Sequence, residues 1–186
     1  MAHAQENNVL RQPETSYELF SLIEGRWDVK FINDFENTII EGISINFEKI
    51  IKEKNSEVIL QGEFMDPTGE VAGGLKIRLF PSEPNKVLCS GMSEEDLSAG
   101  AVSQGMGEDV ISLGDNEEAY LIVFETTVAP EDENIVIKTD TALLKWWFIL
   151  ADDFRFEIHV FIKDGDNQFI PVSRLEFHRS KDKSNK

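Results

Sequence analysis

Short apolar runs separated by turn residues constrain the fold of this chain more than any other feature. From residue 26 onward almost every run is rich in β-branched and aromatic residues and is bounded by Gly, Pro, Asn, Asp or Ser. Runs of this kind are typical of successive β-strands. We expect strands over residues 26–32, 38–51, 57–65, 74–80, 86–90, 109–113, 119–127, 134–138, 142–150, 154–163 and 168–179.

The connections between these runs favour antiparallel neighbours. Most are turn-like, as in Asp66-Pro67-Thr68-Gly69, whereas a parallel connection needs a crossover of roughly a dozen residues or more. Residues 14–24 read as one short helix that follows Pro13 and ends at Gly25. The sequence therefore predicts a mainly β fold with a short N-terminal helix. A sandwich and a barrel both accommodate a meander, and we favour a single antiparallel barrel because closure removes exposed strand edges.

The predicted domain covers residues 14–180. We expect residues 1–13 to be a disordered N-terminus and residues 181–186 to be a disordered basic tail, because both ends are polar. Residues 90–108 form a long Gly- and Ser-rich segment that carries Met92 and Met106. A lid over the barrel mouth and a plain surface connection both explain this segment.

Alternation in the last three strands predicts which side chains face inward. Alternate positions are apolar, and the positions between them are mostly charged. The inward set is Ala142, Leu144, Trp146, Phe148, Leu150, Phe154, Phe156, Ile158, Val160, Ile162, Phe169, Leu175 and Phe177. Trp147 and Phe161 interrupt the outer face, where they fit either a homodimer contact or a contact with the N-terminal helix.

Charge and composition exclude several classes of function. Lys plus Arg is 18 against 35 for Asp plus Glu, so a net charge of −17 repels nucleic acid and anionic lipid alike. We expect no membrane span, because no apolar stretch approaches the length that a membrane helix needs. Cys89 is the single cysteine, which fits a reducing, cytoplasmic compartment.

The sequence predicts no metal site and no cofactor. Three histidines, His3, His159 and His178, do not form a metal-ligand spacing. A phosphate-binding P-loop motif is missing, and no βαβ unit surrounds Gly105-Met106-Gly107.

Glu24-Gly25-Arg26-Trp27, at the junction of the predicted helix and the first strand, resembles the Gly-x-Trp opening of lipocalins and related calycins, such as fatty-acid-binding proteins. The resemblance implies a calycin-like barrel in which this Trp packs across one end, often under an Arg of the last strand. Strand parity selects Arg179 as that partner of Trp27, and a guanidinium over the indole is a cation–π contact. The family also implies a central cavity for a lipophilic molecule.

We therefore expect a carrier or sequestering protein that binds a small, bulky apolar organic molecule. Its affinity would come from burial against aromatic walls, with Met92 and Met106 above them. The predicted wall residues are Trp27, Trp146, Phe148, Phe156 and Phe177. The alternative is a cofactor-free cyclase or isomerase of specialised metabolism, which folds its substrate in the same space.

Catalysis would need a polar group among the inward apolar ones, since a dry environment shifts its pKa. Along residues 119–127 one parity places Glu125 inward and the other places Tyr120 inward. Glu63 and Arg78 have the same ambiguity, and an outward charge on a strand is the commoner interpretation for each.

Overall fold

A computed structural model describes residues 13–52, 56–91, 101–103, 110–114, 117–127, 141–150, 154–163 and 166–180. Within these residues a single short helix precedes a series of strands. The elements are α1 (Ser16–Ser21), β1 (Gly25–Asn33), β2 (Thr38–Lys52), β3 (Glu57–Met65), β4 (Val71–Leu79), β5 (Val87–Gly91), β6 (Ala101–Ser103), β7 (Val110–Gly114), β8 (Glu117–Thr127), β9 (Thr141–Leu150), β10 (Arg155–Lys163) and β11 (Phe169–Arg179).

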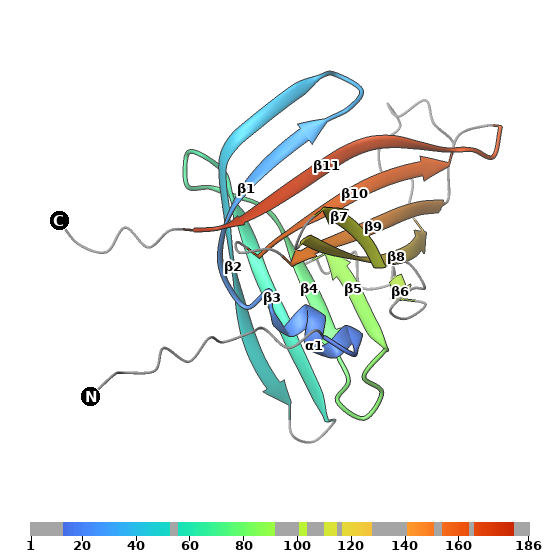
Figure 1. Ribbon diagram of the computed structural model, residues 1–186. Coiled ribbons are helices and arrows are strands. Elements are labelled where there is room, and N and C mark those ends of the chain that lie inside the picture. Colours follow the sequence, from blue (N-terminus) through green and yellow to red (C-terminus); the bar gives the residue numbers. More distant parts are fainter. Residues whose placement is uncertain are drawn as a thin grey trace, which may run out of the picture.

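The described strands form one antiparallel meander sheet that curls into a half-barrel (Figure 1). Their order is β6-β5-β4-β3-β2-β1-β11-β10-β9-β8-β7. The first and last strands pair with each other, and Trp27 lies directly opposite Arg179. The short strand β6 pairs with both β5 and β8. The predicted mainly β fold with a short N-terminal helix is confirmed.

Two details of the secondary structure differ from the sequence-based expectations, and several expected features lie outside the described residues. Strand β6 lies inside the segment expected to be a lid or a surface connection. Strand β4 begins at Val71 rather than at residue 74, because Val71 already pairs with Met65 across the turn at Asp66. The expected strand at 134–138, Met92, Met106 and both expected disordered ends, except for Pro13, lie outside the described residues.

Helix α1 covers the inner face at one end of the half-barrel. Thr15 caps it by accepting a hydrogen bond from the backbone N–H of Glu18 (N···Oγ1 3.2 Å). The Tyr17 N–H donates to the carbonyl of Pro84 in the β4–β5 turn (2.8 Å). The side chains of Leu19, Phe20 and Ile23 are fully buried in the sheet's core. Helix α1 therefore packs against the concave inner face of the sheet.

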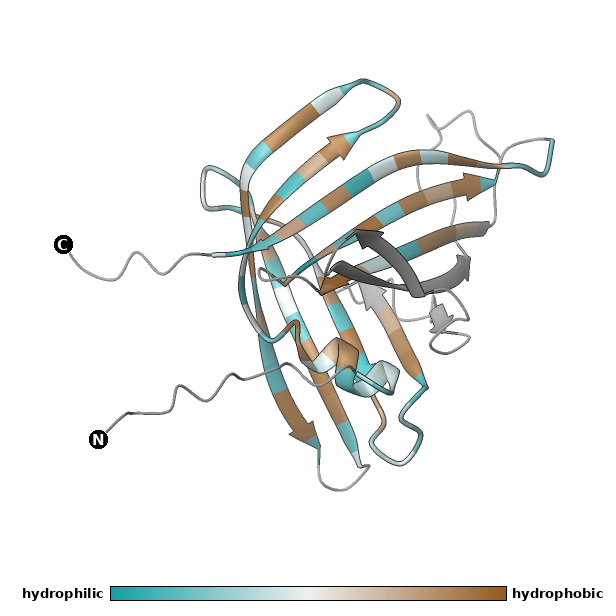
Figure 2. Cartoon of the chain, in the orientation of Figure 1, coloured by the Kyte–Doolittle hydropathy of each residue, from teal (hydrophilic) through white to brown (hydrophobic). Residues whose placement is uncertain are grey.

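The core lies between α1 and the inner face of the sheet. Apolar and polar residues alternate over residues 155–160 of β10 and 174–178 of β11, as the sequence predicted (Figure 2). The inward position expected for Phe169 is wrong: the register of β10 and β11 shifts after Val160, and Phe169 is 37% exposed opposite Lys163. Each of the strands β1–β5 and β8–β11 contributes residues of one parity to the core, such as Ile45 and Phe47 from β2 and Ile77 and Leu79 from β4. One face of the sheet is therefore apolar along its length.

Candidate functional site

Trp27 closes the end of the interior where α1 meets β1. Its side chain is fully buried, and its indole N–H donates to the carbonyl of Ile23 (2.7 Å). Gly25 makes the tight passage from helix to strand with φ +107°, and a Cβ at this position would lie 2.8 Å from a guanidinium nitrogen of Arg179. A side chain at residue 25 would meet both backbone strain and a steric clash.

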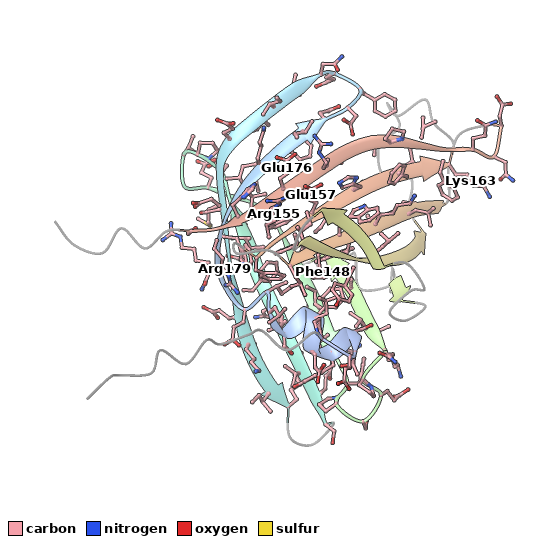
Figure 3. All side chains as sticks on the ribbon, in the orientation of Figure 1. Phe148, Arg155, Glu157, Lys163, Glu176 and Arg179 are labelled. Carbon is pink, nitrogen blue, oxygen red and sulfur yellow. The ribbon has the colours of Figure 1, made fainter. Side chains whose placement is uncertain are left out.

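Arg179 lies over Trp27 at the end of β11 (Figure 3). Its guanidinium carbon is 4.0 Å from the centre of the Trp27 ring, which confirms the predicted cation–π pair. The same guanidinium donates hydrogen bonds to the carbonyls of Leu22 and Glu24, which follow α1. Burial lowers the pKa of Arg179, although an arginine stays charged in proteins. Arg179 thus fastens the last strand to the chain that enters the first.

We expect Arg179→Ala to lower the free energy of unfolding by about 1–3 kcal/mol, because it removes two hydrogen bonds to carbonyls and the ring contact together. Urea unfolding followed by far-ultraviolet circular dichroism measures the loss. Arg26→Ala is the matched control, since the Arg26 side chain is exposed on the opposite face of the neighbouring strand. Equal losses in the two variants would contradict this role of Arg179.

Four further aromatic residues from β9–β11 pack beside Trp27. Trp146, Phe148, Phe156 and Phe177 are all fully buried. The rings of Phe156 and Phe177 stack at 4.1 Å, and those of Trp146 and Phe156 stack at 5.8 Å. Phe20 of α1 contacts Phe148 edge to face at 4.9 Å. The structure therefore brings together all five predicted wall residues, and they contact each other and α1.

One layer further along the inner face, the apolar side chains are only half-buried. These side chains come from five strands, and each has the parity of a core residue two positions away in its strand, or four positions away in the case of Phe64. They are Ile43, Phe64, Leu75, Leu144 and Leu175. Together they form an apolar layer, called here the inner layer, that rests on the buried core and retains access to solvent. Strand parity predicted an inward position for Leu144 and Leu175. The strands before residue 80 alternate less clearly, so the sequence assigned no face to Ile43, Phe64 and Leu75.

Three of the four catalytic candidates have described side chains, and these three do not come together. Tyr120 belongs to the core with 7% exposure, so the parity that places Tyr120 inward holds. Glu63 is exposed on the outer face. Arg78 donates a hydrogen bond to the buried carboxylate of Glu57, and this bond lowers the pKa of Glu57. The backbone of Glu125 pairs with β6 and β9, and its side chain is outside the described part of the structure.

Cys89 also faces the interior and is buried beside the core. Burial raises the pKa of its thiol to about 12. The thiol is therefore neutral near pH 7 and is a poor nucleophile.

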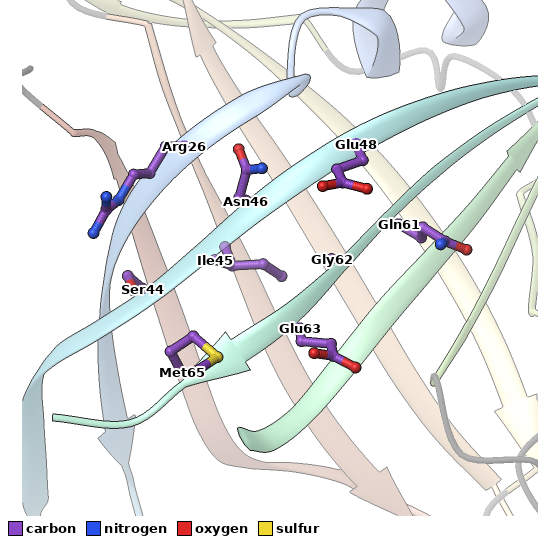
Figure 4. A pocket seen from close by; sticks show the side chains of 9 residues that line it. All are labelled: Arg26, Ser44, Ile45, Asn46, Glu48, Gln61, Gly62, Glu63 and Met65. Atoms are coloured by element: carbon purple, nitrogen blue, oxygen red, sulfur yellow. The ribbon is translucent and has the colours of Figure 1, made fainter. Parts of the chain in front are cut away.

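A polar groove of about 710 Å³ lies on the outer face of β1, β2 and β3 (Figure 4). Strands β2 and β3 approach each other closely at Gly62, where a Cβ would lie 2.5 Å from the carbonyl oxygen of Asn46. The groove offers carboxylates, amides, a hydroxyl and a guanidinium for hydrogen bonds, and Glu63 is the one predicted site residue in its lining. The lining residues are Arg26, Ser44, Ile45, Asn46, Glu48, Gln61, Gly62, Glu63 and Met65.

The outer face of β9 and β10 carries the two interrupting aromatics. Trp147 and Phe161 are half-buried. The Lys145 ammonium is 4.7 Å from the centre of the Phe161 ring, and the ring centres of Trp147 and His159 are 6.5 Å apart. His159 also contacts the Glu157 carboxylate (Nε2···Oε2 2.7 Å), which lowers the pKa of Glu157. A homodimer through Trp147 and Phe161 stays a prediction.

Comparisons with known proteins give no family for this chain. No family model and no curated protein matches it. In the described ranges, no three histidine, cysteine or acidic side chains gather so that they could hold a metal ion. The helix in the same ranges is too short to cross a membrane.

Proposed function

We propose that this chain is a calycin-like protein that binds a small, bulky apolar organic molecule on the inner face of its curled sheet, as a carrier or a sequestering protein. The observation that carries the proposal is the inner layer, in which apolar side chains from five strands remain half-exposed above a dry aromatic core. Ligand affinity at such a surface comes from apolar burial. A cytoplasmic location is part of the proposal, since the buried Cys89 would remain a thiol there.

The Trp27–Arg179 pair supports the calycin-like part of the proposal. A tryptophan that opens the first strand, held under an arginine of the last strand, is what the resemblance implied. In this arrangement α1 and the five buried aromatic residues form the base of the binding site. The inner layer, rather than the base, would contact the ligand, because its side chains are the ones that can still lose exposed area on binding.

Two neighbouring leucines test the proposal. Leu144 belongs to the inner layer, whereas Leu143 precedes it on β9, is also half-buried and points to the other face. We expect Leu144→Asp to weaken binding of the neutral apolar probe N-phenyl-1-naphthylamine about tenfold or more, because a carboxylate replaces roughly 1.5–3 kcal/mol of apolar burial. Probe fluorescence measures the affinity, and Leu143→Asp should leave it close to that of the parent chain.

Circular dichroism must show both variants folded, and Leu175→Ala offers a milder change in the same layer. An unchanged affinity in folded Leu144→Asp and Leu175→Ala would contradict binding at the inner layer.

The cyclase or isomerase alternative differs in its product, since a carrier returns its ligand unchanged and an enzyme alters it. Mass spectrometry of a recovered candidate substrate separates the two.

A further inference from the structure

The inner face of the sheet becomes polar beside the inner layer. Strand pairing places Ser173 of β11 between Asn33 of β1 and Val160 of β10, and Asn33 lies opposite Thr38 of β2. Residues directly opposite each other in antiparallel strands share a face, and Ser173 is two residues from Leu175 of the inner layer. These residues therefore all belong to the inner face. We call the three polar ones, Asn33, Thr38 and Ser173, the polar corner.

The same row of the sheet is apolar on its other side. Val160 lies opposite Leu144, which belongs to the inner layer. Neighbouring strands lie about 4.7–4.9 Å apart, so the backbones at Ser173 and Leu144 are separated by roughly 10 Å. Leu175, two residues along the same strand, is about 7 Å from Ser173. A small ligand that covers Leu144 and Leu175 therefore comes within reach of the polar corner.

The polar corner has hydrogen-bonding groups that are unused within the described residues. The side-chain oxygen of Asn33 accepts hydrogen bonds from the backbone N–H groups of Phe35 and Glu36, at 3.0 Å each. These bonds orient the amide and leave its two side-chain N–H groups without an acceptor in the described part of the chain. The hydroxyls of Thr38 and Ser173 make no hydrogen bond there either. The corner can therefore bind an oxygen-containing group of a ligand.

The surroundings of the polar corner disfavour a charged group. Asn33 and Val160, which lie opposite Ser173, carry no charge. The adjacent Arg174 points to the outer face, where it contacts Glu176 (Nε···Oε1 3.1 Å). A carboxylate that loses water without a paired cation is destabilised, and the net charge of −17 adds to this effect. A neutral hydroxyl or carbonyl avoids it, because the corner's amide and hydroxyls replace the lost water.

We infer that the molecule bound at the inner layer carries one neutral oxygen group, a hydroxyl or a carbonyl, which the polar corner binds. The inference rests on the proposed function and narrows the ligand from an apolar molecule to a neutral amphipathic one. Apolar burial on the inner layer supplies most of the affinity. The polar corner sets the orientation of the ligand and selects against charged analogues.

Three naphthalene derivatives with the same apolar body test the inference: 2-naphthalenemethanol, 2-naphthoate and 2-methylnaphthalene. Each is titrated at pH 8 into the protein loaded with N-phenyl-1-naphthylamine, and the loss of probe fluorescence gives its affinity. We expect the alcohol to bind about tenfold more tightly than the naphthoate, whose carboxylate is ionised at this pH.

Ser173→Ala isolates the hydrogen bond at the corner. It should weaken binding of the alcohol about two- to tenfold, the range of one hydrogen bond, and leave binding of 2-methylnaphthalene unchanged. Ser44→Ala is the matched control, since Ser44 is a half-buried serine on the outer face of β2 and should change neither affinity. Ser173→Lys should reverse the preference, because its ammonium group pairs with the naphthoate.

Failure of the inference and failure of the proposed function give different results. Binding of 2-methylnaphthalene that Leu144→Asp weakens identifies the inner layer as the site. Equal affinities for the alcohol and the naphthoate, or an alcohol affinity unchanged in Ser173→Ala, would then overturn the inference alone. If neither the probe nor 2-methylnaphthalene binds the parent chain, the proposed function fails and the inference fails with it.

Discussion

Replacement of Trp27 by alanine is expected to lower the free energy of unfolding by about 3–5 kcal/mol, the cost of truncating a large buried aromatic side chain. The variant loses the hydrogen bond to the Ile23 carbonyl, the Arg179 contact, and the edge-to-face contact with Phe156 at 4.9 Å. Urea unfolding monitored by circular dichroism measures the change without relying on tryptophan emission. Binding of N-phenyl-1-naphthylamine should persist wherever the variant remains folded.

Trp147→Ala provides the comparison, since Trp147 is half-buried on the outer face of the same sheet. Trp147→Ala should lower the free energy of unfolding by less than half as much as Trp27→Ala, because a half-buried side chain loses less apolar burial and leaves no closed cavity. Similar losses at the two positions would show that Trp27 does not seal the end of the interior.

Phe156→Ala is expected to lower the free energy of unfolding by a similar amount, about 3–5 kcal/mol. Phe156 lies at the centre of the aromatic core, where it stacks on Phe177 at 4.1 Å and on Trp146 at 5.8 Å and approaches Phe47 at 6.4 Å. Thermal or urea unfolding of the purified variant measures the loss.

Phe161→Ala, on the outer face of the same strand, is the matched control for Phe156→Ala. A double-mutant cycle between Phe156 and Phe177 should give a coupling of about 0.5–1.5 kcal/mol, as for other aromatic pairs. A loss of less than about 1 kcal/mol in Phe156→Ala would contradict a densely packed base, since closely packed cores respond to small volume changes.

The sequence predicted the strands of the second half well, because apolar residues recur at alternate positions along them, even though Leu143, Trp147 and Phe161 add apolar side chains to the other face. In β10, for example, Phe156 and Ile158 are buried on the inner face, and Glu157 and His159 alternate with them. The same alternation selected the aromatic core. The Gly-x-Trp opening, together with strand parity, predicted the Trp27–Arg179 pair.

The inner layer was harder to predict than the core. Parity assigns a face to a side chain, but it does not say how far along the barrel axis the helix reaches. Phe20 of α1 contacts Trp146 and Phe148, and this contact makes two expected wall residues part of the dry base. Those two residues differ from Leu144 and Leu175 in being covered by α1. The position of α1 depends on tertiary contacts such as the hydrogen bond from the Tyr17 N–H to the Pro84 carbonyl.

The outer groove was missed for a different reason. Its shape depends on how closely β2 and β3 approach at Gly62, where the Asn46 carbonyl leaves no space for a side chain. A lone glycine inside a strand is a known signal of such an approach. Its neighbours Gln61 and Glu63 read simply as the polar face of a strand, so nothing in the pattern indicated a groove.

Methyl nuclear magnetic resonance tests binding at the inner layer most directly. Isoleucine and leucine methyls are labelled in the full chain, and N-phenyl-1-naphthylamine is added in steps. We expect the methyls of Ile43, Leu75, Leu144 and Leu175 to shift together with one affinity, while those of Leu143 on the outer face stay in place. Shifts confined to the outer face, or no shift in the inner layer at saturating probe, would contradict binding at the inner layer.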